Sequence, residues 1–109
     1  MTPERYGIYL AALDPTVGRE IAKTRPVVIV SLDMLNRVLD TVVVCPLTTK
    51  LHPGWRSRLP VRCAGKPAEV AVDQIRTIST LRLVRKVDSL GAAAAEKLRH
   101  TIVEMYGTP

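Results

Sequence analysis

Hydrophobic positions along this chain fall into short runs that are separated by turn residues. The most continuous run is Val27–Ser31, which the dipeptide Arg25-Pro26 introduces. Short runs rich in β-branched residues are typical of strands, and a proline is tolerated at a strand start because its missing N–H costs least there. Similar runs between Asp-Pro, Pro-Gly and Gly-Lys-Pro turn signals predict strands at Tyr6–Leu13, Thr41–Leu47, Leu59–Cys63, Glu69–Asp73 and Arg82–Val87.

Two segments show helical patterns instead. Asp33–Arg37 is long enough for one turn, and we expect Asp33 to be its N-cap. Between Ala92 and Tyr106 apolar residues recur at the spacing of one buried helix face: Leu98, Ile102 and Met105 or Tyr106. The opposite face is polar: Glu96, His100 and Glu104. We expect Gly107 to end this helix as its C′ residue.

These elements predict one mostly β domain with minor α, which spans residues 1–109. Five or more short strands cannot form a large sandwich, but they can form a small, strongly curved barrel that removes its own sheet edges. The C-terminal helix would cover one side of this barrel. Two polar, basic loops, Thr16–Thr24 and Thr48–Arg58, would project from it.

Composition and charge narrow the possible partners. Aromatic residues make up only 4% of the chain and Phe is absent, so aliphatic residues must build the core, which suits pleated strands. The net charge of +6 favours a nucleic acid or an acidic protein as the partner. A membrane is not expected, because no apolar run approaches the roughly 18 residues that span a bilayer and the polar start does not resemble a signal peptide.

The cysteines indicate the compartment. Cys45 and Cys63 form neither a CxxC pair nor a metal-spaced cluster with histidine. Cys45 lies inside an apolar run, which indicates a buried thiol. We therefore expect a reducing environment, hence the cytoplasm, and neither a cofactor nor a metal site.

Three motifs occur in a fixed order. Residues 13–31 read LDPTVGREIAKTRPVVIVS, residues 45–49 read CPLTT, and residues 71–78 read AVDQIRTI. Together with the closing helix they resemble the signature of the MazF/PemK toxins over about residues 5–106. This resemblance implies a strongly curved SH3-like barrel of the MazF/PemK/CcdB type and a homodimer. It also implies sequence-specific, metal-independent cleavage of single-stranded RNA and neutralisation by an acidic antitoxin.

The resemblance also assigns roles to particular residues. Arg25 and Thr48 match the catalytic arginine and threonine of the family, and Glu20 matches a glutamate of the same site. Asp73 matches an aspartate that is catalytic in one branch. That branch also uses an arginine two positions earlier, where this chain has Ala71, so Asp73 is either catalytic or structural.

The residue types suit this chemistry on physical grounds. RNA supplies its own nucleophile, the 2′-OH, and attack on the adjacent phosphorus gives a 2′,3′-cyclic phosphate and a 5′-OH. Arg25, held extended by Pro26, could donate to two phosphoryl oxygens and stabilise their growing charge. Thr48 could hold the phosphate, and Glu20 is the candidate general base.

Basic, polar and aromatic residues of the same regions are candidate RNA contacts: Arg19, Lys23, Thr49, Lys50, His52, Trp55, Arg56, Arg58, Gln74 and Arg76. Each also has a simpler interpretation. Arg25 could pair with Glu20 at the surface, and Trp55 could anchor its loop rather than stack on a base. At the level of the molecule, the alternatives are a non-catalytic inhibitor on the same fold, as in the gyrase poisons, and an inactive RNA-binding barrel.

Overall fold

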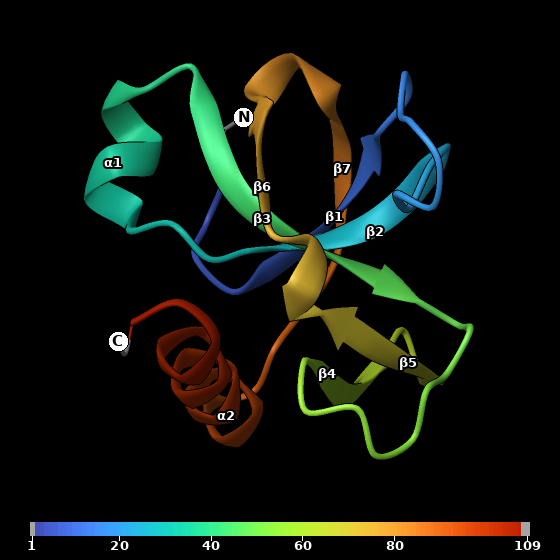
Figure 1. Cartoon of the computed structure of the whole chain (residues 1–109). Coiled ribbons are helices and arrows are strands. Elements are labelled where there is room, and N and C mark those ends of the chain that lie inside the picture. Colours follow the sequence, from blue (N-terminus) through green and yellow to red (C-terminus); the bar gives the residue numbers. More distant parts are fainter. Residues whose placement is uncertain (1, 108–109) are drawn as a thin grey trace.

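Seven antiparallel strands form one strongly curved sheet in the computed structural model, which describes residues 2–107 (Figure 1). The strands follow the order β4-β5-β3-β2-β1-β7, and β6 pairs in addition with the first half of β3. Their bounds are β1 Gly7–Ala12, β2 Thr24–Ile29, β3 Thr41–Thr48, β4 Arg58–Cys63, β5 Lys66–Ala71, β6 Arg76–Ser79 and β7 Leu83–Ser89.

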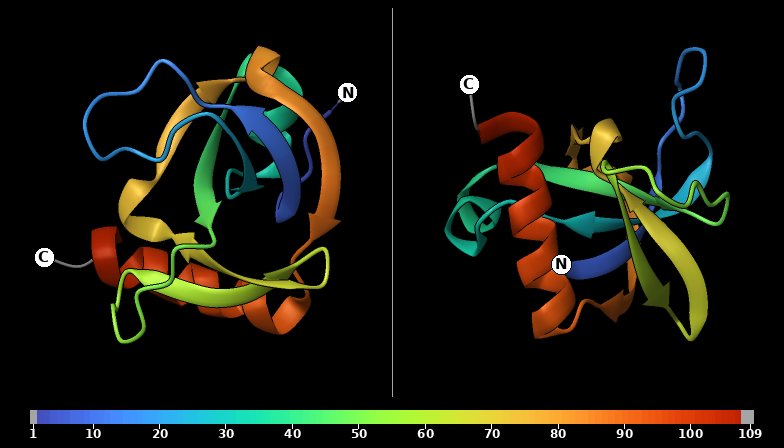
Figure 2. Two further views of the ribbon diagram at one scale, coloured as in Figure 1. Left: turned by 90° about the vertical axis from the view of Figure 1, so that its right-hand side faces the viewer. Right: turned by 60° about the horizontal axis from the view of Figure 1, so that its bottom comes forward.

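Two helices lie outside the sheet. Helix α1 spans Asp33–Val38 between β2 and β3, and helix α2 spans Ala92–Ile102 and continues as a π turn over Val103–Gly107. Short 3₁₀ turns, Val72–Gln74 and Thr80–Arg82, follow β5 and β6. Helix α2 packs against β4 and the first of these turns, on the outside of the curved sheet (Figure 2). None of the helices among residues 2–107 is long and apolar enough to cross a membrane.

The sheet buries both faces of β2. Val27 and Ile29 pack into one apolar cluster inside the curve, whereas Val28 and Val30 pack into a second cluster that includes Leu98 of α2. Successive side chains of a strand point to opposite faces, so a strand buried on both sides needs an unbroken apolar run. This explains the run after Pro26 and confirms the predicted mostly β fold with a C-terminal helix.

The boundaries around β5 and β6 differ from the sequence prediction. Lys66 and Pro67 were expected in a turn but lie in β5, because Ala64 and Gly65 alone make the turn, with φ of 49° and 79°. Such a two-residue turn needs positive φ at both positions. The predicted strand Glu69–Asp73 therefore ends early, and Asp73 lies in a 3₁₀ turn. Strand β6 was missed because its four residues carry little apolar pattern, yet they pair with Thr41–Val44 of β3.

The predicted N-cap of α1 is wrong by one residue. Leu32 occupies the N-cap position without a side-chain cap, and Asp33 lies in the first turn. Its carboxylate Oδ1 instead accepts the backbone N–H of Arg5 at 2.7 Å. Asp33 therefore ties the N-terminal segment to α1.

The end of α2 also differs from the prediction. Leu98 is fully buried and Ile102 half-buried, whereas Met105 is 36% and Tyr106 53% exposed, because the π turn rotates them off the buried face. The Tyr106 hydroxyl donates to the carbonyl oxygen of Val72 at 2.7 Å. Gly107 lies within the π turn without a positive φ, so the expected C′ glycine cap is absent.

Candidate active site

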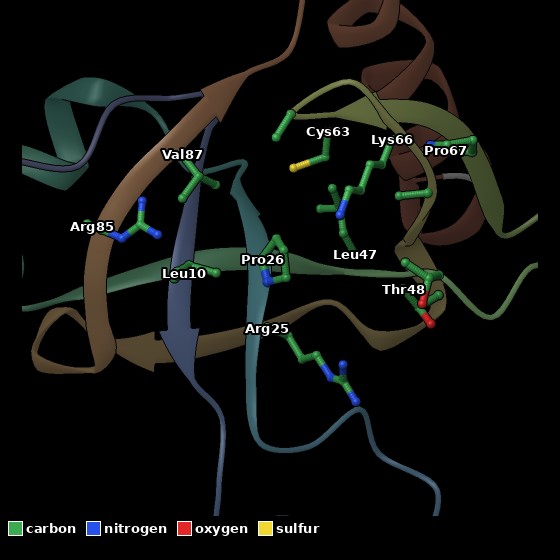
Figure 3. Close-up of a pocket in the computed structure, with 13 residues that line it drawn as sticks. Leu10, Arg25, Pro26, Leu47, Thr48, Cys63, Lys66, Pro67, Arg85 and Val87 are labelled. Carbon is green, nitrogen blue, oxygen red and sulfur yellow. The ribbon is translucent and has the colours of Figure 1, made fainter.

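Arg25 and Thr48 line the same surface cavity, of about 280 Å³. Arg25 is the second residue of β2, opposite Ala11 of β1, and Thr48 is the last residue of the neighbouring β3. In Figure 3 the Arg25 guanidinium extends toward the side of the cavity where Thr48 lies. The motif residues that were expected to act together on a phosphate are thus brought together by adjacent strands.

Local hydrogen bonds prepare both side chains for an anion. The Nε of Arg25 donates to the carbonyl oxygen of Ala22 at 3.3 Å, which leaves the terminal nitrogens of the exposed guanidinium free. The Oγ1 of Thr48 accepts the backbone N–H of Lys50 at 3.0 Å. Because this bond uses an acceptor site of the hydroxyl, the Thr48 O–H remains free to donate to a phosphate oxygen.

Glu20 lies apart from these two residues. It is exposed in the loop between β1 and β2, where its Oε1 accepts the backbone N–H of Val17 at 2.9 Å. It lines a separate cavity of about 340 Å³, which it shares with Arg19, Asp73, Gln74 and Arg76 among others. Within residues 2–107 Glu20 forms no ion pair with Arg25, so the surface pair considered from the sequence is not present.

Asp73 is held by Arg58. The Nε and Nη2 of Arg58 donate to the two carboxylate oxygens at 2.8 and 3.4 Å, and the Arg58 side chain is only 7% exposed. Partial burial raises the pKa of Asp73, but the hydrogen bonds and charge of Arg58 outweigh burial and hold this pKa below its ordinary value. A carboxylate of low pKa is a weak base near neutral pH. The geometry thus favours structural roles for both Asp73 and Arg58.

A third and larger cavity, of about 700 Å³, is also lined by Thr48, together with residues of the loop between β3 and β4. The rings of His52 and Trp55 stack there with centroids 3.9 Å apart, and Trp55 is half exposed. Arg58 lies 5.1 Å from the Trp55 ring centroid. An aromatic platform of this kind can accept a base by stacking.

Glu69 positions this platform, and sequence reasoning did not select it. Its two carboxylate oxygens accept the backbone N–H of His52 at 2.9 and 3.1 Å, and Arg58 Nη1 lies 3.9 Å from it. Glu69 is only 3% exposed. The available signal was a carboxylate within an otherwise apolar strand, since buried charges require partners.

The remaining predicted RNA contacts are spread over this face. Lys23, Thr49 and Lys50 are exposed, and Thr49 lines the Arg25 cavity. Arg56 forms an ion pair with Glu104 after α2. The side chain of Arg76 is partly buried, with an Nη1 that has no partner within the described residues. Gln74 uses its Oε1 to accept the backbone N–H of Ile21 at 2.7 Å, so it holds the β1–β2 loop.

Both cysteines are free thiols. Cys45 is fully buried, as predicted; burial above all, and then the charge of Asp73, raises its pKa to about 12. Cys63 is half-buried and lines the Arg25 cavity. In the part of the chain that the structure describes, no three His, Cys, Asp or Glu side chains are grouped so that they could hold a metal ion.

Comparisons with known proteins agree with this fold. The chain is 28% identical to the endoribonuclease EndoA of Bacillus subtilis over 106 residues, which cover 90% of this chain and 89% of that protein. The Mycobacterium tuberculosis toxin MazF-mt6 superposes with a TM-score of 0.79 at 27% identity, covering 94% of this chain and 98% of that one. A mycobacterial endoribonuclease solved with its cognate antitoxin has the same fold, with a TM-score of 0.82 at 22% identity over 98% and 97% of the two chains.

The family assignment rests on a match over almost the whole chain. Residues 4–106 match the family model described as PemK-like, MazF-like toxin of type II toxin–antitoxin system. This span contains all three sequence motifs, the curved sheet and helix α2. The chain therefore belongs to the PemK-like, MazF-like toxins of type II toxin–antitoxin systems.

Proposed function

We propose that this chain cleaves single-stranded RNA at specific sequences, without a metal ion, and leaves 2′,3′-cyclic phosphate and 5′-OH ends. The observation that carries this proposal is the shared cavity of Arg25 and Thr48, in which both side chains have free donors. Membership of a toxin family and likeness to two proteins named as endoribonucleases support the reaction class.

The chemistry assigned to this cavity starts with the phosphate that joins two nucleotides. Arg25 donates from its terminal nitrogens to the non-bridging oxygens, and the Thr48 hydroxyl donates to the same phosphate. The 2′ oxygen forms a bond to phosphorus, and the bond from phosphorus to the 5′ oxygen breaks, which leaves that oxygen to take up a proton from water. Negative charge grows on the phosphoryl oxygens, so fixed cationic donors are the main source of acceleration.

The 2′-OH must lose a proton, and we assign this step to Glu20. The assignment rests on its motif position and on its loop, which projects from the barrel between β1 and β2 (Figure 2). Because Glu20 lines a different cavity from Arg25, the loop would have to bring its carboxylate closer when RNA binds. Asp73 is the weaker candidate, since its carboxylate is committed to Arg58.

The partners follow from the family and the charge. We propose that an acidic antitoxin neutralises the protein by covering the cationic face, because a basic surface attracts either polyanion. We further propose that the protein is a cytoplasmic homodimer. No cofactor enters the proposed reaction, because RNA supplies the nucleophile and the chain supplies the donors.

The direct test incubates the purified protein and an Arg25→Ala variant with a long mixed-sequence RNA in EDTA and maps the new ends. We expect cuts at one short sequence with 5′-OH ends in wild type, and a loss of cleavage by about two orders of magnitude or more in the variant. A folded wild type that cuts no RNA would contradict the proposal. Inhibition of gyrase, unchanged by Arg25→Ala, would then support the non-catalytic alternative.

A further inference from the structure

Two cationic residues outside the sequence motifs line the cavity of Arg25 and Thr48. Lys66 is the first residue of β5, and Arg85 lies on β7 opposite Leu10 of β1. Figure 3 shows Arg85 and Lys66 on opposite sides of Pro26. Three strands that are distant in sequence thus contribute the three cations of this cavity, Arg25, Lys66 and Arg85.

The charge of this cavity is of one sign. Among the residues that line it there is no carboxylate, and none of its three cations forms an ion pair within residues 2–107. The two neighbouring cavities on this face, by contrast, both include the carboxylate of Asp73. Unpaired like charges repel each other, and a bound anion lowers this repulsion. Of the three cavities, the one around Arg25 is therefore the best suited to an anion.

The rest of the cavity is apolar. Leu10, Pro26, Leu47 and Val87 contribute to its walls, and its volume of about 280 Å³ is at the lower end for small-molecule sites. An apolar hollow with cations at its edge suits a ligand that has one flat, weakly polar part and one anionic part. A single nucleotide, with its base and its phosphate, has these two parts.

The position of Thr48 connects this cavity to the aromatic platform. Thr48 lines both the Arg25 cavity and the larger cavity of His52 and Trp55. A phosphate held at Arg25 and Thr48 therefore has one neighbouring nucleotide on each side. One would reach the stacked rings, and the other would enter the apolar hollow between Lys66 and Arg85.

We propose that the hollow between Lys66 and Arg85 is a nucleotide subsite, in which these two residues bind the backbone phosphate next to the cleaved one and the apolar wall accepts the base. The inference rests on the proposed RNA-cleaving function and identifies which part of the substrate this side of the site binds. Base preference next to the cut would then depend also on residues of β5 and β7, which lie outside the two basic loops.

The test measures binding separately from cleavage. Fluorescence anisotropy follows binding of a labelled RNA that contains the mapped cut site, made uncleavable by a 2′-deoxy nucleotide at the cut; a mixed pool of such RNAs serves if no cut is found. The test variant is Lys66→Gln with Arg85→Gln. The matched control, Arg37→Gln with Lys97→Gln, removes the same charge from exposed helix positions that do not line the cavity.

We expect the test variant to raise Kd by about tenfold or more and the control by no more than about twofold. The slope of log affinity against log salt should fall by about 0.7, because one phosphate of the single strand is no longer neutralised. The single variant Lys66→Arg keeps the positive charge and should therefore leave the salt slope at its wild-type value. Circular dichroism and light scattering of each variant establish that fold and mass are unchanged.

Two outcomes would overturn the subsite. The first is a test variant that binds like its control. The second is a folded test variant whose mass changes together with its binding, which would make this face an interface between copies of the chain. Cleavage by wild type is scored separately. If the wild type cuts no RNA but the variants bind as expected, only the proposed reaction is contradicted. If the wild type cuts RNA but the test variant binds it as tightly as the control does, only the subsite is contradicted.

Discussion

Individual charged residues of this protein divide into those that hold the fold and those that are free for a ligand. Arg58 was a candidate RNA contact, yet its side chain is almost fully buried and paired with Asp73. Arg25 has the opposite character, since it is exposed and has no carboxylate partner within residues 2–107. The type of side chain is the same, and only the three-dimensional pairing separates the two roles.

The Asp73–Arg58 pair should make stability depend on acid pH. The folded-state pKa of Asp73 is below the ordinary value of 3.8, so the pair stabilises the fold above that pH and this stabilisation disappears as pH falls further. We expect Asp73→Asn to lower the free energy of unfolding by about 1 kcal/mol at pH 7, a figure that allows for solvent screening of this partly exposed pair. Urea unfolding at pH 7 and at about pH 2 measures the difference, which should vanish in acid.

Asp40→Asn is the matched control for this experiment. Asp40 is exposed, and its side chain forms no ion pair within the described residues. This variant should match wild type at both pH values. If Asp73→Asn were equally stable at pH 7, the bond to Arg58 would contribute nothing and Asp73 would be free for another role.

At the scale of elements, the loop between β1 and β2 is the part of the candidate site that carries Glu20. Its residues from Val17 to Glu20 are exposed, and Gly18 and Lys23 have positive φ. Beyond the strands, Gln74 contacts it from the 3₁₀ turn after β5, through the N–H of Ile21. Gln74 therefore has a structural role within its motif, because it holds the loop that carries Glu20.

Removing this hydrogen bond should loosen the loop without unfolding the barrel. We expect Gln74→Ala to increase the rate of tryptic cleavage after Arg19 or Lys23 by about fivefold, which corresponds to a decrease in stabilisation of about 1 kcal/mol. Mass spectrometry of early digestion products identifies the first cut. Thr77→Ala, at an exposed position of neighbouring β6, should digest like wild type. An unchanged first cut in Gln74→Ala would show that other contacts hold the loop.

At the scale of the whole molecule, the sequence predicted the fold better than the site. The unbroken apolar run after Pro26 indicated a strand, and the three motifs indicated the family; both are confirmed. Which residues line the same cavity was less predictable from the sequence, because this depends on how the strands pair. Glu20 is close to Arg25 in sequence but lines another cavity, whereas Lys66 and Arg85 are distant in sequence and line the same one.

Exposed apolar surface on α1 and after α2 bears on the proposed homodimer. Met34 and Val38 are 62% and 73% exposed, and Val103 and Tyr106 are more than half exposed. Leu32 and Leu35 line one cavity together with Val103, and apolar side chains that are grouped at the surface often mark an interaction site. Burial of apolar surface is not screened by salt, whereas phosphate binding by lysine and arginine is. A homodimer held by such surface and an RNA-binding face should therefore respond differently to ionic strength.

Light scattering across a salt series separates the salt dependence of the homodimer from that of RNA binding. We expect a mass of twice the 12.0 kDa chain both at about 0.1 M and at about 1 M NaCl, while RNA binding weakens steeply over the same range. The matched measurement is anisotropy of a single-stranded RNA in the same buffers. A mass of one chain at both salt concentrations would exclude the homodimer. A mass that falls with salt would mean that charged contacts hold the two copies together. The cationic face would then be the candidate for their interface.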